Sequence, residues 1–519
     1  MNGAESLLTA LLQNDVDVCF ANPGTSEMHF VSALDRVGNM RCVLGLFEGV
    51  VTGAADGYGR MLNRPAVTLL HLGPGLANGL SNLHNAMRAN SPIVNVIGDH
   101  ASFHRQLDAP LTSDIEGAAR PFSHWVRTSA GADSLALDAV AAVAAARSAP
   151  GRIASLILPA DAAWNEVSIP PPNVSSIELA TAPARPPDAA IDTAATLLKS
   201  GGTTALILAG QATLQAPLEF AGMIGATCGA RLYSQTLTAR ISRGAGRVAI
   251  ERIPYPIDQA VAFLQDVDNI ILVGAKAPVG FFAYPGKPGR LFQPGTRIHE
   301  LVGAEGDITY ALDALADAVG ARRTDLVTID LDLPARPSGS ITPEKIGQLL
   351  AATLPANAIV IDESITTGRR FFPATRSSQP HDWLLPTGGS IGFALPVAAG
   401  AAIACPERKV VCLESDGSGM YMPQALWTHA RESLNILTIV FANRKYQILR
   451  NEMHNVGVAE IGPRASGLLD IDNPEINWVT LARSFGVDAQ RVDSMDSFSG
   501  AIDAGLATQG PYLIEVVLQ

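Results

Sequence analysis

The chain has 519 residues, a formal net charge of −12 and no Lys/Arg-rich run, which argues against nucleic acid or anionic membranes as main partners and favours a small-molecule substrate. Hydrophobic residues make up 47% and charged residues 17%, a composition that indicates folded globular domains rather than a disordered chain. At this length we expect about three domains.

Neither a targeting segment nor a membrane segment is predicted. The first residues lack the basic and then apolar layout of a signal peptide, and no apolar run reaches the roughly 20 residues that span a bilayer. The five cysteines lack metal-type spacing, so we expect reduced core residues. They are Cys19, Cys42, Cys228, Cys405 and Cys412. We therefore expect a cytoplasmic protein.

Short β-branched segments alternate with Ala/Leu-rich helical segments along the whole chain. This alternation predicts the α/β class, with three doubly wound parallel-sheet domains. Two proline-rich segments, 168–190 and 329–345, are the predicted linkers, which leaves domains 1–167, 190–328 and 344–519. The expected strands include 18–22, 66–72, 93–99, 204–210, 269–275, 358–364, 409–415 and 436–443.

The most informative segment lies between the ends of two consecutive expected strands. One strand ends at Asp416-Gly417-Ser418, and the next ends at Asn443, 27 residues after Asp416. A carboxylate and an amide oxygen suit Mg²⁺ that is held mostly through a phosphorylated partner. Gly417 allows close approach of the backbone, and Ser418 can offer its hydroxyl and amide to phosphate. Taken alone, this pattern is more often an ordinary strand-to-helix turn.

This segment resembles the thiamine-diphosphate enzyme superfamily, whose signature is Gly-Asp-Gly followed at this interval by Asn-Asn. Ser415 and Ala442 replace the first residue of each element, whereas Asp416 and Asn443 are retained. The resemblance implies thiamine diphosphate and Mg²⁺ as cofactors, with Asp416, Asn443 and the Lys445 carbonyl as metal ligands. It also implies a pyrimidine-binding first domain, a central domain and a diphosphate-binding third domain.

Other segments extend the resemblance over nearly the whole chain. ANPGTSEMHF, HLGPGLANGLSNLHNA and TGGSIGFALPVAAGAA are similar to segments of acetolactate synthase and benzoylformate decarboxylase. The resemblance makes Glu48 the glutamate that hydrogen-bonds the aminopyrimidine ring, although an acid there could also cap a helix. It makes His71 a proton-transfer residue, with a structural histidine as the alternative. Thr25, Ser26 and Glu27 would contact substrate.

Four further residues are assigned to the cofactor by the same resemblance. Gly389 should accept a hydrogen bond from the pyrimidine amino group, and Ile391 should hold the cofactor in its bent shape. A plain core isoleucine is the alternative for Ile391. Ser364 and Thr366 occupy positions near the diphosphate, and a helix N-cap is the alternative role for both.

The substrate end is predicted on the helix that follows Asn443. Ile448, Leu449 and Glu452 are expected to shape the pocket, where Glu452 binds a hydroxyl or an amine, or else lies on a solvated helix face. The central segment lacks the second catalytic histidine of benzoylformate decarboxylases, since residues 281–284 are Phe, Phe, Ala and Tyr. FAD is not expected, because the segments that hold it in acetolactate synthases are not recognised.

The resemblance implies a thiamine-diphosphate-dependent 2-oxo acid decarboxylase or carboligase, acting as a homodimer or homotetramer. One alternative is a carbon–carbon lyase of the benzaldehyde or 2-hydroxyacyl type. Another is a catalytically weakened cofactor-binding homologue, suggested by Ser415 and Ala442. An NAD-dependent dehydrogenase is disfavoured because LILAGQATLQ lacks the glycine fingerprint that should follow such a strand.

Overall fold

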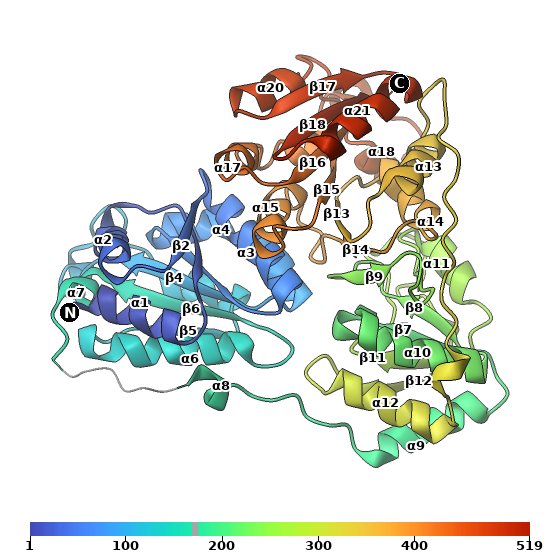
Figure 1. The fold of residues 1–519 in the computed structure, drawn as a ribbon, viewed down its shortest axis with the longest axis horizontal. Helices are drawn as coiled ribbons and strands as arrows, with labels where there is room; N and C mark the ends of the chain where they lie inside the picture. The colour runs from blue at the N-terminus through green and yellow to red at the C-terminus, as the bar shows by residue number, and fades with distance from the viewer. Residues whose placement is uncertain (169–174, 519) are drawn as a thin grey trace.

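A computed structural model describes residues 1–168 and 175–518 and shows three sheets of the expected α/β class (Figure 1). Residues 169–174, within the first expected linker, and Gln519, at the end of the third expected domain, lie outside the described residues. The remainder of that linker segment contains the short helix α8 (Ser176–Leu179). None of the described helices is long and apolar enough to cross a membrane.

The first sheet has six parallel strands in the order β2-β1-β3-β4-β6-β5. Separate buried clusters cover its two faces, so helices lie on both sides. Its strands are β1 (Val18–Ala21), β2 (Arg41–Leu44), β3 (Ala66–Leu70), β4 (Ile93–Asp99), β5 (Trp125–Thr128) and β6 (Ile153–Pro159). Its helices are α1 (Gly3–Gln13), α2 (Met28–Val37), α3 (Glu48–Leu62), α4 (Leu72–Ala89), α5 (Ile115–Ala119), α6 (Leu135–Arg147) and α7 (Ala160–Trp164).

The second sheet has five parallel strands in the order β10-β8-β7-β11-β12. Two apolar clusters pack against its faces. Its strands are β7 (Thr204–Leu208), β8 (Arg231–Ser234), β10 (Glu251–Arg252), β11 (Asn269–Val273) and β12 (Arg297–Val302). Its helices are α9 (Asp188–Lys199), α10 (Gln215–Cys228), α11 (Ile257–Leu264) and α12 (Ile308–Val319).

The third sheet has seven strands in the order β17-β18-β16-β15-β13-β14-β9, and β9 (Ile241–Arg243) comes from the central segment. All its pairs are parallel except β14 with β9. The other strands are β13 (Ala358–Asp362), β14 (His381–Leu384), β15 (Val410–Ser415), β16 (Ile436–Ala442), β17 (Asp488–Val492) and β18 (Tyr512–Val517). The helices are α13 (Pro343–Thr353), α14 (Phe371–Ala374), α15 (Ala394–Ala404), α16 (Asp416–Gly419), α17 (Ala425–Arg431), α18 (Gln447–Asn455), α19 (Pro463–Ser466), α20 (Trp478–Ser484) and α21 (Met495–Ala507).

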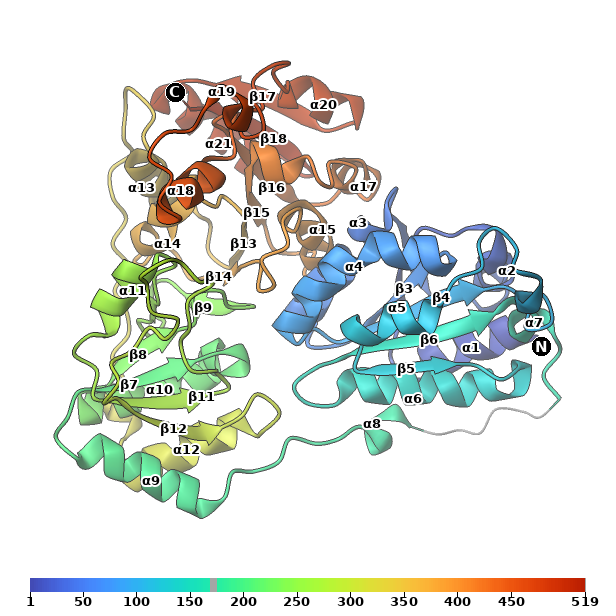
Figure 2. The same ribbon diagram turned by 180° about the vertical axis from the view of Figure 1, so that it is seen from behind.

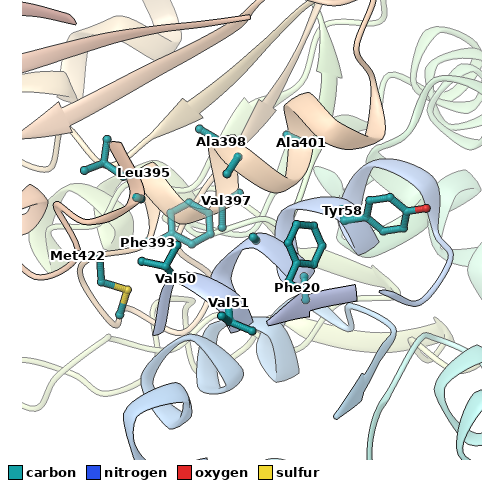
Figure 3. Packing of buried hydrophobic residues seen from close by; sticks show 14 of the residues in the cluster. Phe20, Val50, Val51, Tyr58, Phe393, Leu395, Val397, Ala398, Ala401 and Met422 are labelled. Atoms are coloured by element: carbon teal, nitrogen blue, oxygen red, sulfur yellow. The ribbon is translucent and has the colours of Figure 1, made fainter. Parts of the chain in front are cut away.

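Helices α3 and α15 join the first and third units, as Figure 2 shows from behind. A Cβ atom at Gly57 would overlap the carbonyl oxygen of Val397, and one at Gly400 would overlap that of Ala54. The two helices therefore touch backbone to backbone. Side chains from both helices share one buried cluster, part of which is drawn in Figure 3.

A buried ion pair lies at the same junction. The guanidinium of Arg60 donates to Asp56 through Nε at 2.8 Å and Nη2 at 2.7 Å, and both side chains are almost fully buried. Nη1 donates to the carbonyl of Leu385 at 2.7 Å, and the guanidinium lies 4.8 Å from the ring centroid of Phe393. Because both charges are hydrogen-bonded, the pair can be buried without an unpaired charge.

All eight segments predicted as strands form strands. The expectation that the cysteines are core residues holds for Cys19, Cys405 and Cys412 but is wrong for Cys42, which is exposed. The reason is that β2 lies at the edge of its sheet. Cys228 is half-buried.

A Gly→Ala substitution should be destabilising at the α3–α15 contact and stabilising in a helix where the added methyl group meets no neighbour. Gly57→Ala should lower the free energy of unfolding by about 1–3 kcal/mol, because the added methyl group overlaps backbone that cannot rotate away. Gly500→Ala in α21, where a Cβ meets nothing within 4 Å, should raise stability by about 0.5–1 kcal/mol through helix propensity. Thermal and denaturant unfolding measure both values. A stable Gly57→Ala protein would contradict the close packing.

Candidate active site

A histidine and a buried glutamate meet at the carboxyl edge of the first sheet. β1 and β3 are neighbours, so the turn Thr25–Glu27 and His71 emerge side by side. Glu27 is 1% exposed and accepts from His71 Nδ1 at 2.9 Å, from Ser26 Oγ at 2.5 Å and from Gly24 N at 2.7 Å. With the Nδ1 proton engaged by Glu27, Nε2 of a neutral His71 is left as an acceptor. Thr25 is exposed.

Glu48 lies at the start of α3, close to this histidine. Its carboxylate is 6% exposed and accepts from Asn78 Nδ2 at 2.9 Å. The N-cap position belongs to Phe47, and Glu48 does not cap the helix with its side chain. A Cβ atom at Gly75 would lie 3.3 Å from both Glu48 Oε1 and His71 Cβ, so both side chains border one glycine. The structure thus places two of the predicted catalytic residues together.

The predicted metal ligands meet at the carboxyl edge of the third sheet. β15 and β16 pair in parallel, with Ser415 opposite Phe441, so Asp416 and Asn443 follow neighbouring strand ends. Asp416 accepts from Arg444 N at 2.5 Å and from Gly417 N at 3.0 Å. Asn443 Oδ1 accepts from Lys445 N at 3.1 Å. Burial raises the pKa of Asp416 to about 6.

This donor set fits Mg²⁺ that is shared with a phosphorylated group. Among residues 1–168 and 175–518, no group of three or more His, Cys, Asp and Glu could by itself hold a metal ion. One carboxylate, one amide and one carbonyl oxygen would leave other octahedral positions to water and phosphate. A Cβ at Gly417 would lie 2.6 Å from the Tyr446 ring, so only glycine leaves the backbone accessible beside that ring.

Two of the predicted phosphate-side hydroxyls are engaged within the protein. Ser418 Oγ donates to the buried carboxylate of Glu414, and Ser364 Oγ donates to Asp362, each at 2.5 Å. Thr366 is the N-cap residue of the short 3₁₀ helix 367–370, but its side chain makes no capping bond. The backbone amide of Ser364 also donates to Asp362, at 3.0 Å, so this residue has both of its donors engaged within the protein.

The loop before α15 is held in place by a buried acid that the sequence did not single out. Glu363 accepts from the amides of Gly392, Phe393 and Ala394 at 2.7–2.9 Å. Burial raises the pKa of Glu363 to about 8, although these amides favour the carboxylate. Gly389, in the same loop, has a φ of +73°, a conformation that favours glycine. Ile391 is only half-buried and lies outside the core clusters.

The central segment lines one side of a cavity at the predicted substrate end. A cavity of about 320 Å³ is lined by Tyr255, Phe281, Tyr284, Arg369 and Glu452 among others. A Cβ at Gly389 would lie 2.8 Å from Phe281 Cζ, so this ring borders the predicted pyrimidine site.

Helix α18 forms the opposite side of this cavity. The Tyr284 hydroxyl donates to Glu452, which is half-buried on a helix that has no fully buried residue. Ile448 is half-buried and Leu449 is exposed.

Three contacts were missed by reasoning from the sequence. The Glu27–His71 bond follows from the adjacency of β1 and β3. The alternation of strands and helices along the sequence does not reveal which strands are neighbours. Tyr284 lies 168 residues from Glu452 in the chain, too far for any local pattern. The sequence predicted Glu363 only as part of the strand 358–364. Its bonds to three amides were missed because these amides lie far along the chain, at the start of α15.

The outer parts of the chain match two family domains. Residues 1–117 match the thiamine pyrophosphate enzyme N-terminal TPP binding domain, and residues 366–516 match the C-terminal TPP binding domain. A Mycobacterium tuberculosis protein provisionally named acetolactate synthase large subunit IlvX is 47% identical over 519 residues, covering 100% of this chain and 99% of its own length. Benzoylformate decarboxylase from Pseudomonas aeruginosa is 27% identical, over 98% of this chain and 97% of its own.

The fold is also shared with solved structures. The thiamine diphosphate-dependent 4-hydroxybenzoylformate decarboxylase of Rhodococcus jostii RHA1 superimposes with a TM-score of 0.86 at 24% identity, covering 100% of this chain and 99% of the other. At this identity the likeness concerns the fold.

The Glu27–His71 contact predicts the tautomer of the histidine ring. In the wild type the proton should reside on Nδ1, because the Glu27 carboxylate can only accept. Glu27→Gln should allow the amide to donate instead, which moves the proton to Nε2. Nitrogen-15 NMR of histidine-labelled protein distinguishes the two tautomers. Glu48→Gln is the matched control and should leave the His71 signals in the wild-type pattern; an Nε2 proton in the wild type would refute the assignment.

Proposed function

The chain belongs to the thiamine pyrophosphate enzyme family, and from this we propose that it uses thiamine diphosphate and Mg²⁺ to decarboxylate a 2-oxo acid. The cycle ends either in protonation to an aldehyde or in addition to a second carbonyl compound. The observation that carries the proposal is the buried Glu48 carboxylate beside His71, on a chain that also retains Asp416 and Asn443 at paired strand ends.

Each candidate residue has a definite task in this proposal. Thiamine diphosphate, when bound, supplies a nucleophilic carbon and an electron sink for the electrons that carbon dioxide leaves behind. Asp416, Asn443 and the Lys445 carbonyl would hold Mg²⁺, whose charge would stabilise the diphosphate. Glu48 would hydrogen-bond the pyrimidine ring and could exchange a proton there, with its low exposure keeping competing water away. His71, oriented by Glu27, moves a proton to or from the substrate.

We propose that a second subunit completes each site. Among the described residues, no hydrogen bond joins Glu48 or His71 to the Asp416–Asn443 group. Large apolar side chains are exposed beside both halves: Leu46 is 44% exposed, and Met420 and Tyr421 are 38% and 52% exposed. Exposed apolar residues next to a functional site are typical of an interface. The minimum assembly is a homodimer.

We further propose that the substrate carries an aromatic ring with a hydroxyl at its far end. The cavity beside Gly389 begins with Phe281 and Tyr255, whose ring centroids are 5.4 Å apart, and it reaches the Tyr284–Glu452 pair. The relative named benzoylformate decarboxylase acts, by its name, on an aromatic 2-oxo acid.

A hydroxyl suits the far end better than an amine does. The carboxylate of Glu452 has lone pairs beyond the one used by Tyr284, so it can accept another hydrogen bond. Arg369 also lines this cavity and would repel an ammonium group, whereas the charge of Lys287 is paired with Asp258.

The first experiment measures carbon dioxide release from protein reconstituted with thiamine diphosphate and Mg²⁺, across pyruvate and branched, aromatic and hydroxyaromatic 2-oxo acids. Glu48→Gln should reduce the rate at least about 100-fold, because the amide cannot exchange a proton. No carbon dioxide from cofactor-loaded wild type would overturn the decarboxylase proposal, and aldehyde release from 2-hydroxy ketones would then identify a lyase.

Mixing two inactive variants tests the shared site. When Glu48→Gln and Asp416→Asn subunits are unfolded together and refolded, a hybrid dimer keeps one intact site if each site is built from two chains. About a quarter of wild-type activity should return at equal amounts. If each site lies within one chain, the mixture stays inactive.

The hydroxyl preference is tested by replacing the proposed acceptor. Glu452→Leu should lower kcat/KM for the 4-hydroxyphenyl 2-oxo acid about 10- to 100-fold relative to its phenyl analogue, because a hydrogen bond to a charged group is lost. Glu460→Leu removes an exposed acid that does not line the cavity and should keep the wild-type preference. An unchanged ratio in Glu452→Leu would refute the role of Glu452.

A further inference from the structure

We propose that Cys19 and Cys42 form a reversible disulfide that makes the first sheet a redox-responsive element. The two residues are direct partners in the parallel pairing of β1 with β2, so their side chains emerge on the same face. Both are free thiols in the structure. Neighbouring strands lie about 4.8 Å apart, within the range of Cα separations that disulfides span.

The two thiols have different surroundings, which suits a reactive pair. Cys42 is exposed on the edge strand, whereas Cys19 is fully buried beneath the helices that cover this face. The proximity of the two thiols lowers the pKa of Cys42 and, together with burial, raises that of Cys19, whose Sγ donates to the carbonyl of Phe20 at 3.7 Å. Cys42 is therefore the accessible nucleophile, and Cys19 is the resolving thiol.

The oxidant is a low-molecular-weight disulfide such as oxidised glutathione. The Cys42 thiolate attacks one of its sulfurs, forms a mixed disulfide and releases one thiol. Cys19 then loses its proton and attacks Cys42 Sγ, which releases the second thiol. Two cysteine thiols lose two protons and two electrons, and one small disulfide gains them.

Cys19 and Cys42 lie on the two strands that lead to the predicted site residues Glu27 and Glu48. β1 leads into the turn that ends at Glu27, and β2 leads within four residues to Glu48. A bond between Cys19 and Cys42 would join the two strands that lead to Glu27 and to Glu48. We expect oxidation to change the position of Glu27 relative to Glu48, and thiol–disulfide exchange to reverse it.

The test uses the folded wild type, so it does not depend on the stability of a variant. The protein is incubated with oxidised glutathione, alkylated, digested and analysed by mass spectrometry. A peptide pair joined through Cys19 and Cys42, about 2 Da below the sum of the reduced peptides and lost on treatment with dithiothreitol, is expected. A Cys42–glutathione adduct with Cys19 still alkylatable, or no reaction at Cys42, would overturn the proposal.

Two variants and an activity measurement complete the experiment. Cys42→Ser should abolish the linked pair, whereas Cys228→Ser, which removes a half-buried cysteine elsewhere, should leave it intact. The oxidised wild type should show a lower kcat that dithiothreitol restores. The linked peptide is scored without any substrate, so a failure of the proposed decarboxylation would not be confused with a failure of this inference.

Discussion

The close packing of α3 against α15 is the constraint on which the arrangement of the site depends. Small residues at the crossing bring two backbones into contact, and no larger side chain could occupy Gly57 or Gly400 without moving a helix. Glu48 opens α3, and the loop with Gly389 and Ile391 leads into α15. The helix crossing thereby fixes how the Glu48 part and the Gly389 part of one chain lie relative to each other.

A buried ion pair stabilises the junction between the first and third units. Asp56 and Arg60 are one helical turn apart and neutralise each other, while the spare donor of Arg60 reaches a carbonyl of the third unit. Glu363 acts within the third unit, where it accepts hydrogen bonds from three amides and fixes the start of α15. The Asp56–Arg60 pair satisfies all of its hydrogen bonds only when α3 lies against the third unit, so it favours one relative placement of the two units.

The fold was predictable from the sequence wherever a local pattern carried the information. Buried parallel strands need uninterrupted β-branched runs, and the adjacency of Asp416 and Asn443 follows from consecutive strands. Contacts that depend on strand order or on distant segments were not predictable. The Glu27–His71 bond, the contact of Tyr284 with Glu452 and the exposure of Cys42 on an edge strand all need the three-dimensional neighbours, which no spacing rule supplies.

Strand β9 limits where this chain can be joined to the chain of a relative. It comes from the central segment, yet it pairs with β14 and closes an edge of the third sheet. A chimaera whose breakpoint falls between residues 243 and 381 would take β14 and its edge partner from different parents, and a mismatch would leave unpaired amides and carbonyls open to aggregation. The central and third units therefore share a sheet edge, and a chimaera keeps this pair from one parent only when its breakpoint lies before residue 241 or after residue 384.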